Sequence, residues 1–367
     1  KFLGKFGMIN KIGYLKKFWK NKKVFITGHT GFKGAWISIF FHLLGAKVYG
    51  YALKQNKISL YNIANLEKII TKSFIEDIRD YNKLKKSIKN ISPDFVIHMA
   101  AQPLVRYSYD FPKETFEVNT VGTLNILNII NELNNIKNVL IITTDKVYKN
   151  INQKKYFKEN DELGGHDPYS NSKACAELVC QSYYSSFLSK KNISCVTARA
   201  GNVIGGGDFA VNRIIPDFFR CLKNKKRLVL RYPNAIRPWQ HVMEPLFGYI
   251  LLLMNISKNK NLKNGAWNFG PKKSNNVKVK KITQILNSNF NNQIKISEKY
   301  DSKNKYKESN ILKLSSEKSK KTLRWHPKYN INQSIKLISD WHKALKKNKK
   351  DILNFTQNQI LNYINQY

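Results

Sequence analysis

Acidic residues are scarce in this chain: 24 Asp and Glu stand against 64 Lys and Arg, so the formal net charge is +40. Such an excess is typical of proteins that bind nucleic acid or anionic membranes. Arginine is scarce as well, because only nine of the cations are arginines and lysine is spread along the whole length. No basic cluster with interleaved aromatic residues localises the charge. We therefore expect a lysine-rich surface and no nucleic-acid partner.

Cysteine and long apolar runs are also lacking. The four cysteines form no C-x-x-C pair, which argues against a disulfide framework and a zinc site and favours thiols in a reducing, cytoplasmic compartment. The longest apolar runs, residues 37–44 and 249–254, fall short of the roughly 20 residues of a spanning helix. Residues 1–7 lack the apolar core of a signal peptide, and we expect Met8 to be the natural initiator.

What the chain does have is the pattern of an α/β protein. Its 367 residues, 42% of them hydrophobic, suffice for one large or two modest domains. Short apolar runs expected to be strands alternate with helical periodicity near 34–44, 79–90, 111–134 and 169–188; the expected strands are 24–27, 47–51, 74–76, 95–99, 139–143 and 194–198. This alternation predicts a doubly wound parallel Rossmann sheet.

A change of texture after Arg199 suggests a second unit. Glycines 205–207 lead into an expected helix at 212–222 and a proline-punctuated stretch. The glycines could wrap a ligand or form a turn. We expect an N-terminal extension (1–20), a dinucleotide-binding domain (21–199, with 241–256 packing back on it) and a smaller C-terminal substrate-binding domain (200–240 and 257–367).

The first expected strand runs into a glycine-rich loop, 27–34 (TGHTGFKG), that opens a helix. Glycine permits the tight turn, and free backbone N–H groups at a helix start bind pyrophosphate. The loop's place at the head of a strand-helix-strand series indicates a dinucleotide site. The acid that usually follows the second strand is missing, since 51–54 reads YALK, and Lys33 lies within the loop. On charge alone, NADP therefore stays open beside NAD.

Two further clusters carry chemistry. Tyr169 and Lys173 are four residues apart and share a helix face, so the ammonium can lower the pKa of the phenol, normally about 10. Such a phenol can take a hydroxyl proton while hydride leaves the same carbon. Asp145 and Lys146 follow Thr144 at the end of the fifth expected strand and form an acid/base pair there. A surface ion pair would be the plain alternative.

Together these segments resemble the nucleotide-sugar 4,6-dehydratases of the extended short-chain dehydrogenase/reductase superfamily, and among them the enzymes that act on CDP-glucose. The resemblance covers most of the chain, from about residue 19 to 271 and more faintly to 327. It rests on 27–34 (TGHTGFKG), 98–106 (HMAAQPLVR), 144–150 (TDKVYKN), 167–178 (DPYSNSKACAEL), 198–208 (ARAGNVIGGGD) and 233–249 (PNAIRPWQHVMEPLFGY).

The resemblance implies a three-step reaction. Tyr169, assisted by Thr144 and Lys173, would remove the C4 hydroxyl proton as hydride passes to NAD. Lys146 as base and Asp145 as acid would then eliminate water across C5 and C6. Return of the hydride to C6 would leave CDP-4-keto-6-deoxyglucose, a precursor for deoxysugars and the lipopolysaccharide O-antigen.

The resemblance also implies binding residues, and no metal. For the cofactor these are Gly28, Thr30, Gly31, Phe32, Lys33, Gly34, Asp77, Ile78, Ala100, Ala101, Gln102, Tyr169 and Lys173. For the diphosphate of the substrate they are Asn202 and Arg237, with Arg213 and Arg231 less secure. His98 and His241 lie in matching motifs but are expected to pack rather than react.

Three alternatives stay open. An Asp-Lys pair also follows the threonine in UDP-N-acetylglucosamine 4,6-dehydratases, and a nucleotide-sugar 4-epimerase would use the same tyrosine without elimination. The third is a basic nucleic-acid-binding protein on an inactive dehydrogenase fold. Helices 111–134 and 169–188 could pair two subunits, so we expect a homo-oligomer, a dimer or a tetramer.

Overall fold

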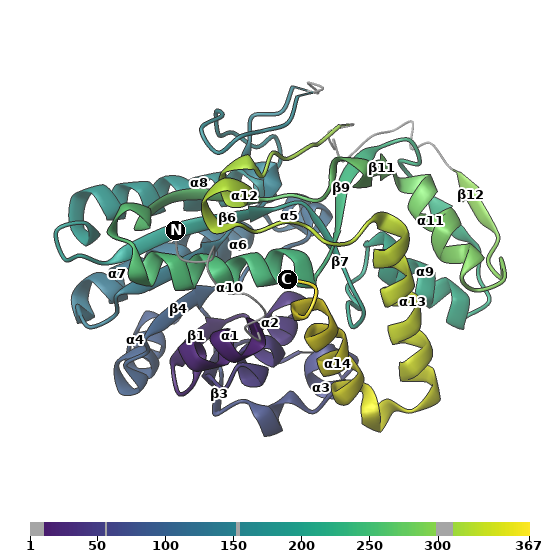
Figure 1. Cartoon of the computed structure of the whole chain (residues 1–367). Helices are drawn as coiled ribbons and strands as arrows, with labels where there is room; N and C mark the ends of the chain where they lie inside the picture. Colours follow the sequence, from purple (N-terminus) through teal and green to yellow (C-terminus); the bar gives the residue numbers. More distant parts are fainter. Residues whose placement is uncertain (1–10, 56, 152–154, 299–310) are drawn as a thin grey trace.

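A parallel sheet forms the centre of the computed structural model, which describes residues 11–55, 57–151, 155–298 and 311–367 (Figure 1). Within these residues, seven parallel strands lie in the order β10-β6-β5-β4-β1-β2-β3. They are β1 (Lys23–Thr27), β2 (Lys47–Ala52), β3 (Lys72–Ile75), β4 (Phe95–His98), β5 (Asn138–Ile142), β6 (Ser194–Ala200) and β10 (Asn264–Phe269). The predicted doubly wound sheet is confirmed, and six strands lie within two residues of their expected ends.

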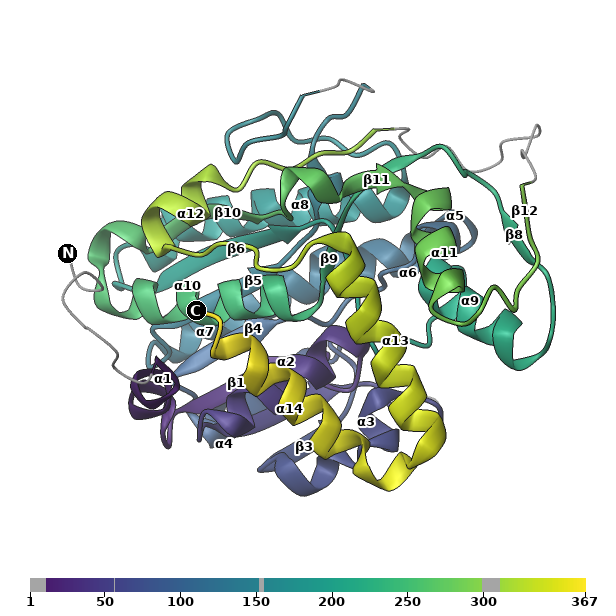
Figure 2. The ribbon, with the colours of Figure 1, turned by 45° about the vertical axis from the view of Figure 1, so that its right-hand side comes forward.

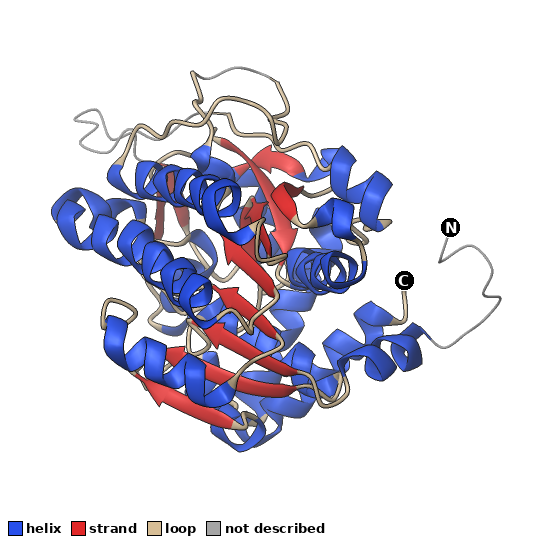
Figure 3. Cartoon of the chain, turned by 90° about the vertical axis from the view of Figure 1, so that its left-hand side faces the viewer, coloured by secondary structure: helices blue, strands red, loops and turns tan. Residues whose placement is uncertain are grey.

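Helices cover both faces of the sheet (Figure 3). One face carries α1 (Lys11–Trp19), α2 (Phe32–Leu43), α10 (Met243–Lys258), α12 (Glu317–Leu323) and α14 (Ile352–Ile364). The other carries α4 (Tyr81–Ile91), α7 (Gly122–Leu133) and α8 (Pro168–Tyr183). Short helices α3 (Leu60–Ile63), α5 (Val105–Asp110) and α6 (Pro112–Phe116) lie in the connections. Strands buried on both faces explain the continuous apolar runs in the sequence.

A smaller unit with its own core lies beside the sheet, at the right of Figures 1 and 2. Its helices are α9 (Ile214–Lys223), α11 (Val279–Ser288) and α13 (Ile331–Lys347). Its strands form the sheets β11-β9-β7 and β12-β8, from β7 (Asn202–Ile204), β8 (Leu228–Leu230), β9 (Ile236–His241), β11 (Asn276–Lys278) and β12 (Ile296–Glu298). β6 ends at Ala200, and the elements of this unit come from the chain after that residue.

Two of the expected domain limits differ from the structure, and one expected helix is more complex than a single α-helix. Residues 1–20 are not merely an extension, because Trp19 of α1 is buried against Phe41 and Phe95. Residues 257–367 do not all belong to the smaller unit: β10 pairs with β6, α12 packs on β10, and α14 packs on α2. The helix expected at 111–134 starts as α6 and continues through a π-helical segment, Glu117–Val121, into α7. As expected, α10 packs back on the sheet.

No helix in the described part of the chain combines the length and apolarity that crossing a bilayer requires.

Candidate active site

Two adjoining cavities open where the parallel strands end. The larger has a volume of about 810 Å³ and reaches into the smaller unit. The other has about 380 Å³ and lies along the glycine loop. Both are lined by Phe32, Lys33, Pro103, Thr143, Tyr169, Asp208 and Arg213. This is the edge at which doubly wound folds bind ligands, and the shared lining means that ligands in the two cavities would meet at Tyr169.

The glycine loop makes the floor of the smaller cavity. Gly28 has φ +77°, and a Cβ there would lie 2.8 Å from the backbone nitrogen of Ala100. A Cβ on Gly34 would lie 2.0 Å from the carbonyl oxygen of Gly28. Only glycine fits at either position, so the backbone N–H groups stay accessible at the start of α2.

Most of the residues predicted to bind the cofactor line this cavity: Gly28, Thr30, Gly31, Phe32, Lys33, Gly34, Asp77, Ile78, Ala100, Ala101, Tyr169 and Lys173. The Asp77 carboxylate is held by the guanidinium and the backbone N–H of Arg79, and the hydrogen bond from that guanidinium is the main reason why the pKa of Asp77 is lowered. Asp77 therefore presents a fixed negative charge at the cavity edge.

The side chain of Gln102, which was predicted to contact the cofactor, makes hydrogen bonds within the protein. The amide nitrogen of Gln102 donates to Leu104 O and Thr115 Oγ1, at 3.2 and 2.9 Å, and its oxygen accepts from Leu104 N. The side chain is thus occupied in shaping its own turn, and Gln102 is absent from the lining of both cavities.

Asp145 and Lys146 lie on a single 3₁₀ turn shortly after β5, Asp145–Val147. Lys146 and Thr144 line the larger cavity, whereas Asp145 is buried beside them and belongs to neither lining. The Asp145 side chain is only 1% exposed. Its Oδ1 accepts from the Thr144 hydroxyl at 3.2 Å and lies 3.6 Å from Lys146 Nζ. Its Oδ2 is buried and has no hydrogen-bond partner. A buried, half-satisfied carboxylate is costly in a purely structural role, so this pair is unlike a surface ion pair.

Tyr169 enters the site on the first turn of α8. Asp167 caps this helix, receiving Ser170 N at 2.9 Å, and Pro168 occupies the first helical position. The phenol was expected to have a lowered pKa, but burial dominates and raises the pKa of Tyr169. The ammonium of Lys146 and a hydrogen bond with the Thr144 side chain oppose that shift. Without ligands, Tyr169 is therefore a protonated donor.

Two lysines at the site have lowered pKa values. Burial and the neighbouring Lys33 lower the pKa of Lys173 to about 7, and its Nζ donates to Ile142 O at 3.2 Å. Burial, followed by repulsion from Arg213, lowers the pKa of Lys33 to about 8. Lys33 lies where the cavities join and not at the ribose end of the smaller one, so it supplies no argument for a 2′-phosphate.

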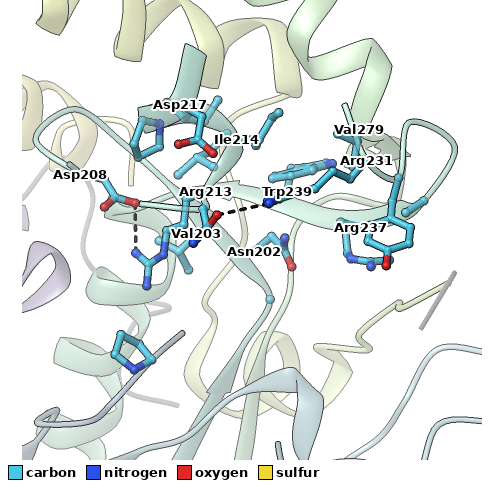
Figure 4. Close-up of a pocket in the computed structure, with 18 of the residues that line it drawn as sticks. Asn202, Val203, Asp208, Arg213, Ile214, Asp217, Arg231, Arg237, Trp239 and Val279 are labelled. Carbon is cyan, nitrogen blue, oxygen red and sulfur yellow. Dashed lines mark hydrogen bonds and ion pairs between the residues drawn. The ribbon is translucent and has the colours of Figure 1, made fainter. Parts of the chain in front are cut away.

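The four residues predicted to bind the substrate line the larger cavity (Figure 4). Asn202 Oδ1 is buried and has no partner. Arg213 donates to Asp208 Oδ2 at 3.0 Å, and Arg231 donates to Asn212 Oδ1 at 3.2 Å. Arg237 is 6% exposed on β9. These four residues bring three guanidinium groups and a free amide oxygen to the larger cavity, a set suited to a diphosphate and a hydroxylated ligand.

Sequence reasoning overlooked part of this lining. Arg220 and Arg227 also face the larger cavity, as do Asp208 and Trp239. Arg199, in contrast, lies outside it and pairs with Glu177 at 2.9 Å. Arginine is rare in this lysine-rich chain, so its presence at positions 220 and 227 could have predicted that these two residues also line the cavity.

The glycines at 205–207 are required mainly for packing. A Cβ on Gly206 would lie 2.2 Å from the ring of Trp341, and one on Gly205 would lie 2.7 Å from Val242. Gly207 has φ +80° and lines the smaller cavity. The loop therefore turns tightly between α2 and α13 and touches the ligand space at its last residue.

The two histidines take the packing role that was expected. Burial lowers the pKa of both His98 and His241 to about 3. His98 Nδ1 is hydrogen-bonded to Thr27 Oγ1 at 2.7 Å, and the His241 ring contacts Trp36 and Tyr329 edge-on.

The fold and this site define a nucleotide-sugar dehydratase, and comparison with known proteins agrees. The family model described as GDP-mannose 4,6 dehydratase matches residues 25–338, and the chain belongs to that family. A CDP-glucose 4,6-dehydratase from Salmonella typhimurium is 41% identical over 355 residues, which cover 95% of this chain and 98% of that relative.

Solved structures share the fold at low identity. An epimerase from Methanothermobacter thermautotrophicus superposes with a TM-score of 0.78 at 21% identity, over 93% of this chain and 98% of that one. A dTDP-glucose 4,6-dehydratase from Streptomyces venezuelae, solved with NAD and TYD bound, gives 0.75 at 20% identity, over 89% and 98%.

Proposed function

We propose that this protein is a CDP-glucose 4,6-dehydratase that converts CDP-glucose to CDP-4-keto-6-deoxyglucose and water, with NAD as its cofactor. One observation carries the proposal: Lys146 lines the same cavity as Tyr169, and the buried Asp145 lies directly behind it, 3.6 Å from its Nζ. An enzyme that only oxidises and reduces C4 has no need of this second acid/base pair. The Salmonella typhimurium relative supports the choice of substrate.

The smaller cavity fits a dinucleotide. Gly28 and Gly34 have no room for a Cβ atom. Because they are glycines, the backbone N–H groups at the start of α2 are accessible to a pyrophosphate. Asp77 and Ile78 at the far end would flank the adenosine, and Tyr169 and Lys173 at the near end would meet the nicotinamide. When bound, NAD would take a hydride from C4 of the sugar and later return one to C6.

In the first step, the Tyr169 phenolate takes the proton of the C4 hydroxyl. The Thr144 hydroxyl orients this group, since it is hydrogen-bonded with Tyr169 and also donates to Asp145. The cations that favour the phenolate are Lys146 and Arg213. A positively charged nicotinamide ring would add to them, so the ionised phenol forms in the loaded site.

In the second step, the C4 ketone makes the C5 proton acidic, and Lys146 removes it after passing its own proton to Asp145, 3.6 Å away. Protonated Asp145 gives its proton to the departing C6 hydroxyl, which leaves as water. Lys146 then returns a proton to C5. The proton gained by Tyr169 passes back to Asp145 through Thr144, which lies between them, and from Asp145 to Lys146, so the enzyme ends as it began.

The oligomeric and cellular parts of the proposal rest on the surface and the thiols. Apolar side chains are exposed on α7 and α8 and the π-helical segments beside them: Val121, Leu124, Leu178 and Phe187. We expect these faces to pair in a homodimer, which Leu178→Glu should dissociate in sedimentation analysis. All four cysteines are free, as suits the cytoplasm.

Mass analysis of the product tests the function. The purified protein, given CDP-glucose and NAD, should form a product lighter by one water. A product of unchanged mass with inverted C4 would instead indicate an epimerase. Turnover of UDP-N-acetylglucosamine without turnover of CDP-glucose would transfer the assignment to that substrate. Salt-sensitive DNA binding without any turnover would support the nucleic-acid alternative.

A further inference from the structure

A buried ion pair lies behind the candidate active site, outside both cavities. Glu177 on α8 and Arg199 on β6 are each 1% exposed. Arg199 Nε donates to Glu177 Oε1 and its NH2 group to Oε2, both at 2.9 Å, in a two-pronged contact. Thr197 adds a hydrogen bond of 2.7 Å to Oε2. The carboxylate is therefore fully engaged and fixed in orientation.

The same pair forms hydrogen bonds with the residues on either side of the catalytic turn, residues 144–147. Just before the turn, Thr143 Oγ1 donates to Glu177 Oε1 at 2.5 Å. Just after it, the Tyr148 hydroxyl accepts from Arg199 NH1 at 2.9 Å, and the guanidinium lies over the Tyr148 ring, 4.9 Å from its centre. One partner holds the entrance of the turn and the other holds its exit.

Because Glu177 lies on α8, these contacts connect the catalytic turn to the helix that carries Tyr169 and Lys173. Tyr169, Lys173 and Glu177 are spaced by four residues and share one helix face. The helix that carries Tyr169 and Lys173 thus also holds, through Glu177, the turn that carries Asp145 and Lys146. The relative placement of the two acid/base pairs depends on this contact.

A second layer of hydrogen bonds steadies the exit of the turn. The Tyr148 hydroxyl donates to Asn268 Oδ1 at 2.7 Å, and Asn268 N donates to Glu159 Oε1 at 2.9 Å. Arg199 NH1 also donates to Glu159 O at 3.0 Å. The network fixes the Tyr148 ring to β10.

Stability alone gives a weak reason for such a pair. Two charges removed from water regain little net free energy from each other, and apolar side chains of similar volume often stabilise as well. What the pair adds is a fixed geometry, and catalytic rates are sensitive to displacements of about 1 Å.

We propose that Glu177 and Arg199 are positioning residues that hold the Asp145–Lys146 turn in register with Tyr169 and Lys173. This inference rests on the proposed dehydration. Tyr169 and Lys173 have anchors of their own, in the capped start of α8 and in Ile142 O. Loss of the pair displaces both reacting residues of the elimination, Asp145 and Lys146, but only Thr144 among the residues of the oxidation, and it therefore impairs elimination more than oxidation.

The test compares Glu177→Gln with Glu244→Gln. Glu244 is an equally buried carboxylate, which accepts from Lys328 N, Tyr329 N and the Tyr363 hydroxyl far from the catalytic turn. Both variants should lower the melting temperature. Oxidation alone is read from cofactor reduction by CDP-6-deoxyglucose, which has no C6 hydroxyl to lose, and the complete reaction from loss of water by CDP-glucose.

In Glu177→Gln, loss of water should fall roughly tenfold or more relative to oxidation, while in Glu244→Gln the ratio of the two rates should stay that of the wild type. Thr143→Val and Tyr148→Phe, which release one end each, should show smaller falls. Equal loss of both rates in Glu177→Gln would overturn the proposal and leave the pair a structural role.

A second readout does not depend on the substrate. Backbone hydrogen exchange over residues 143–148 should be faster in Glu177→Gln and unchanged in Glu244→Gln. Unchanged exchange in both variants would overturn the proposal even in an active enzyme. If exchange is faster in Glu177→Gln but the wild-type protein does not dehydrate CDP-glucose, the proposed function is overturned. The conclusion that Glu177 holds the turn in place would then still stand.

Discussion

Lys173 Nζ donates a hydrogen bond of 3.2 Å to the backbone carbonyl of Ile142, the last residue of β5. The contact fastens the middle of α8 to the strand that leads into Thr144. Burial and the neighbouring Lys33 lower the pKa of Lys173 to about 7 from 10.5. The unfolded chain therefore binds more protons at this residue than the folded protein does between about pH 7 and 10.5.

Lys173→Met tests both consequences. Because the unfolded state holds the extra proton, the penalty that Lys173 imposes on folding should fade as pH rises from 7 to 10. At pH 7 the variant should be the more stable protein, by on the order of a few kcal/mol, with the difference closing toward pH 10. Urea unfolding at several pH values measures this. Oxidation of CDP-glucose should fall roughly a hundredfold or more. A stability difference independent of pH would contradict the assignment.

Lys146→Met tests the elimination step. The variant should still reduce the cofactor with CDP-glucose but should lose water at least about a hundredfold more slowly, because the base for the C5 proton is gone. Rapid mixing with absorbance detection follows the first event, and mass analysis follows the second. Lys149→Met is the matched control. Lys149 lies three residues after Lys146 and forms an exposed ion pair with Glu162. Unimpaired loss of water in Lys146→Met would leave the pair without a catalytic role.

The sequence predicts the sheet and the reacting groups better than the edges of the fold. The strands at 24–27 and 139–143 are apolar runs buried on both faces. The glycine loop follows the first strand, and Thr144, Asp145 and Lys146 follow the second. The strand at Asn264–Phe269 was missed because NGAWNF contains no β-branched residue and begins with residues that disfavour strands. Its place in the sheet comes from pairing with β6, a long-range contact that no local pattern records.

Side-chain direction was the other limit. Gln102 lies within a matching motif, yet its amide is consumed by its own turn, and only coordinates reveal that. Arg199 also follows directly on the start of a matching motif, yet its guanidinium pairs with Glu177 and lies outside both cavity linings. Spacing along a helix predicts that Tyr169 and Lys173 lie close together. It cannot predict that Glu177 pairs with Arg199, because Arg199 lies on β6.

Arg237→Lys tests the substrate end of the larger cavity. A lysine keeps the charge but loses the planar fork that binds two phosphate oxygens. We expect the KM for CDP-glucose to rise roughly tenfold, since a charge-assisted contact contributes about 1.5–3 kcal/mol, while kcat changes less. Lys54→Glu, a larger change of charge at an exposed residue outside both cavity linings, should leave KM within about twofold. Equal effects of the two substitutions would indicate general electrostatic attraction instead of a defined contact.

Gly206→Ala separates the two roles that the glycine-rich loop could have. The added methyl group would meet the Trp341 ring at 2.2 Å, and Gly206 lines neither cavity. We expect a loss of about 2 kcal/mol in the free energy of unfolding from overpacking, with the KM for CDP-glucose and the affinity for NAD unchanged at a temperature where the variant is folded. Combined with Trp341→Leu, which removes the obstructing ring, the cost of the added methyl should shrink. A variant of normal stability that binds either ligand poorly would instead assign the loop to ligand contact.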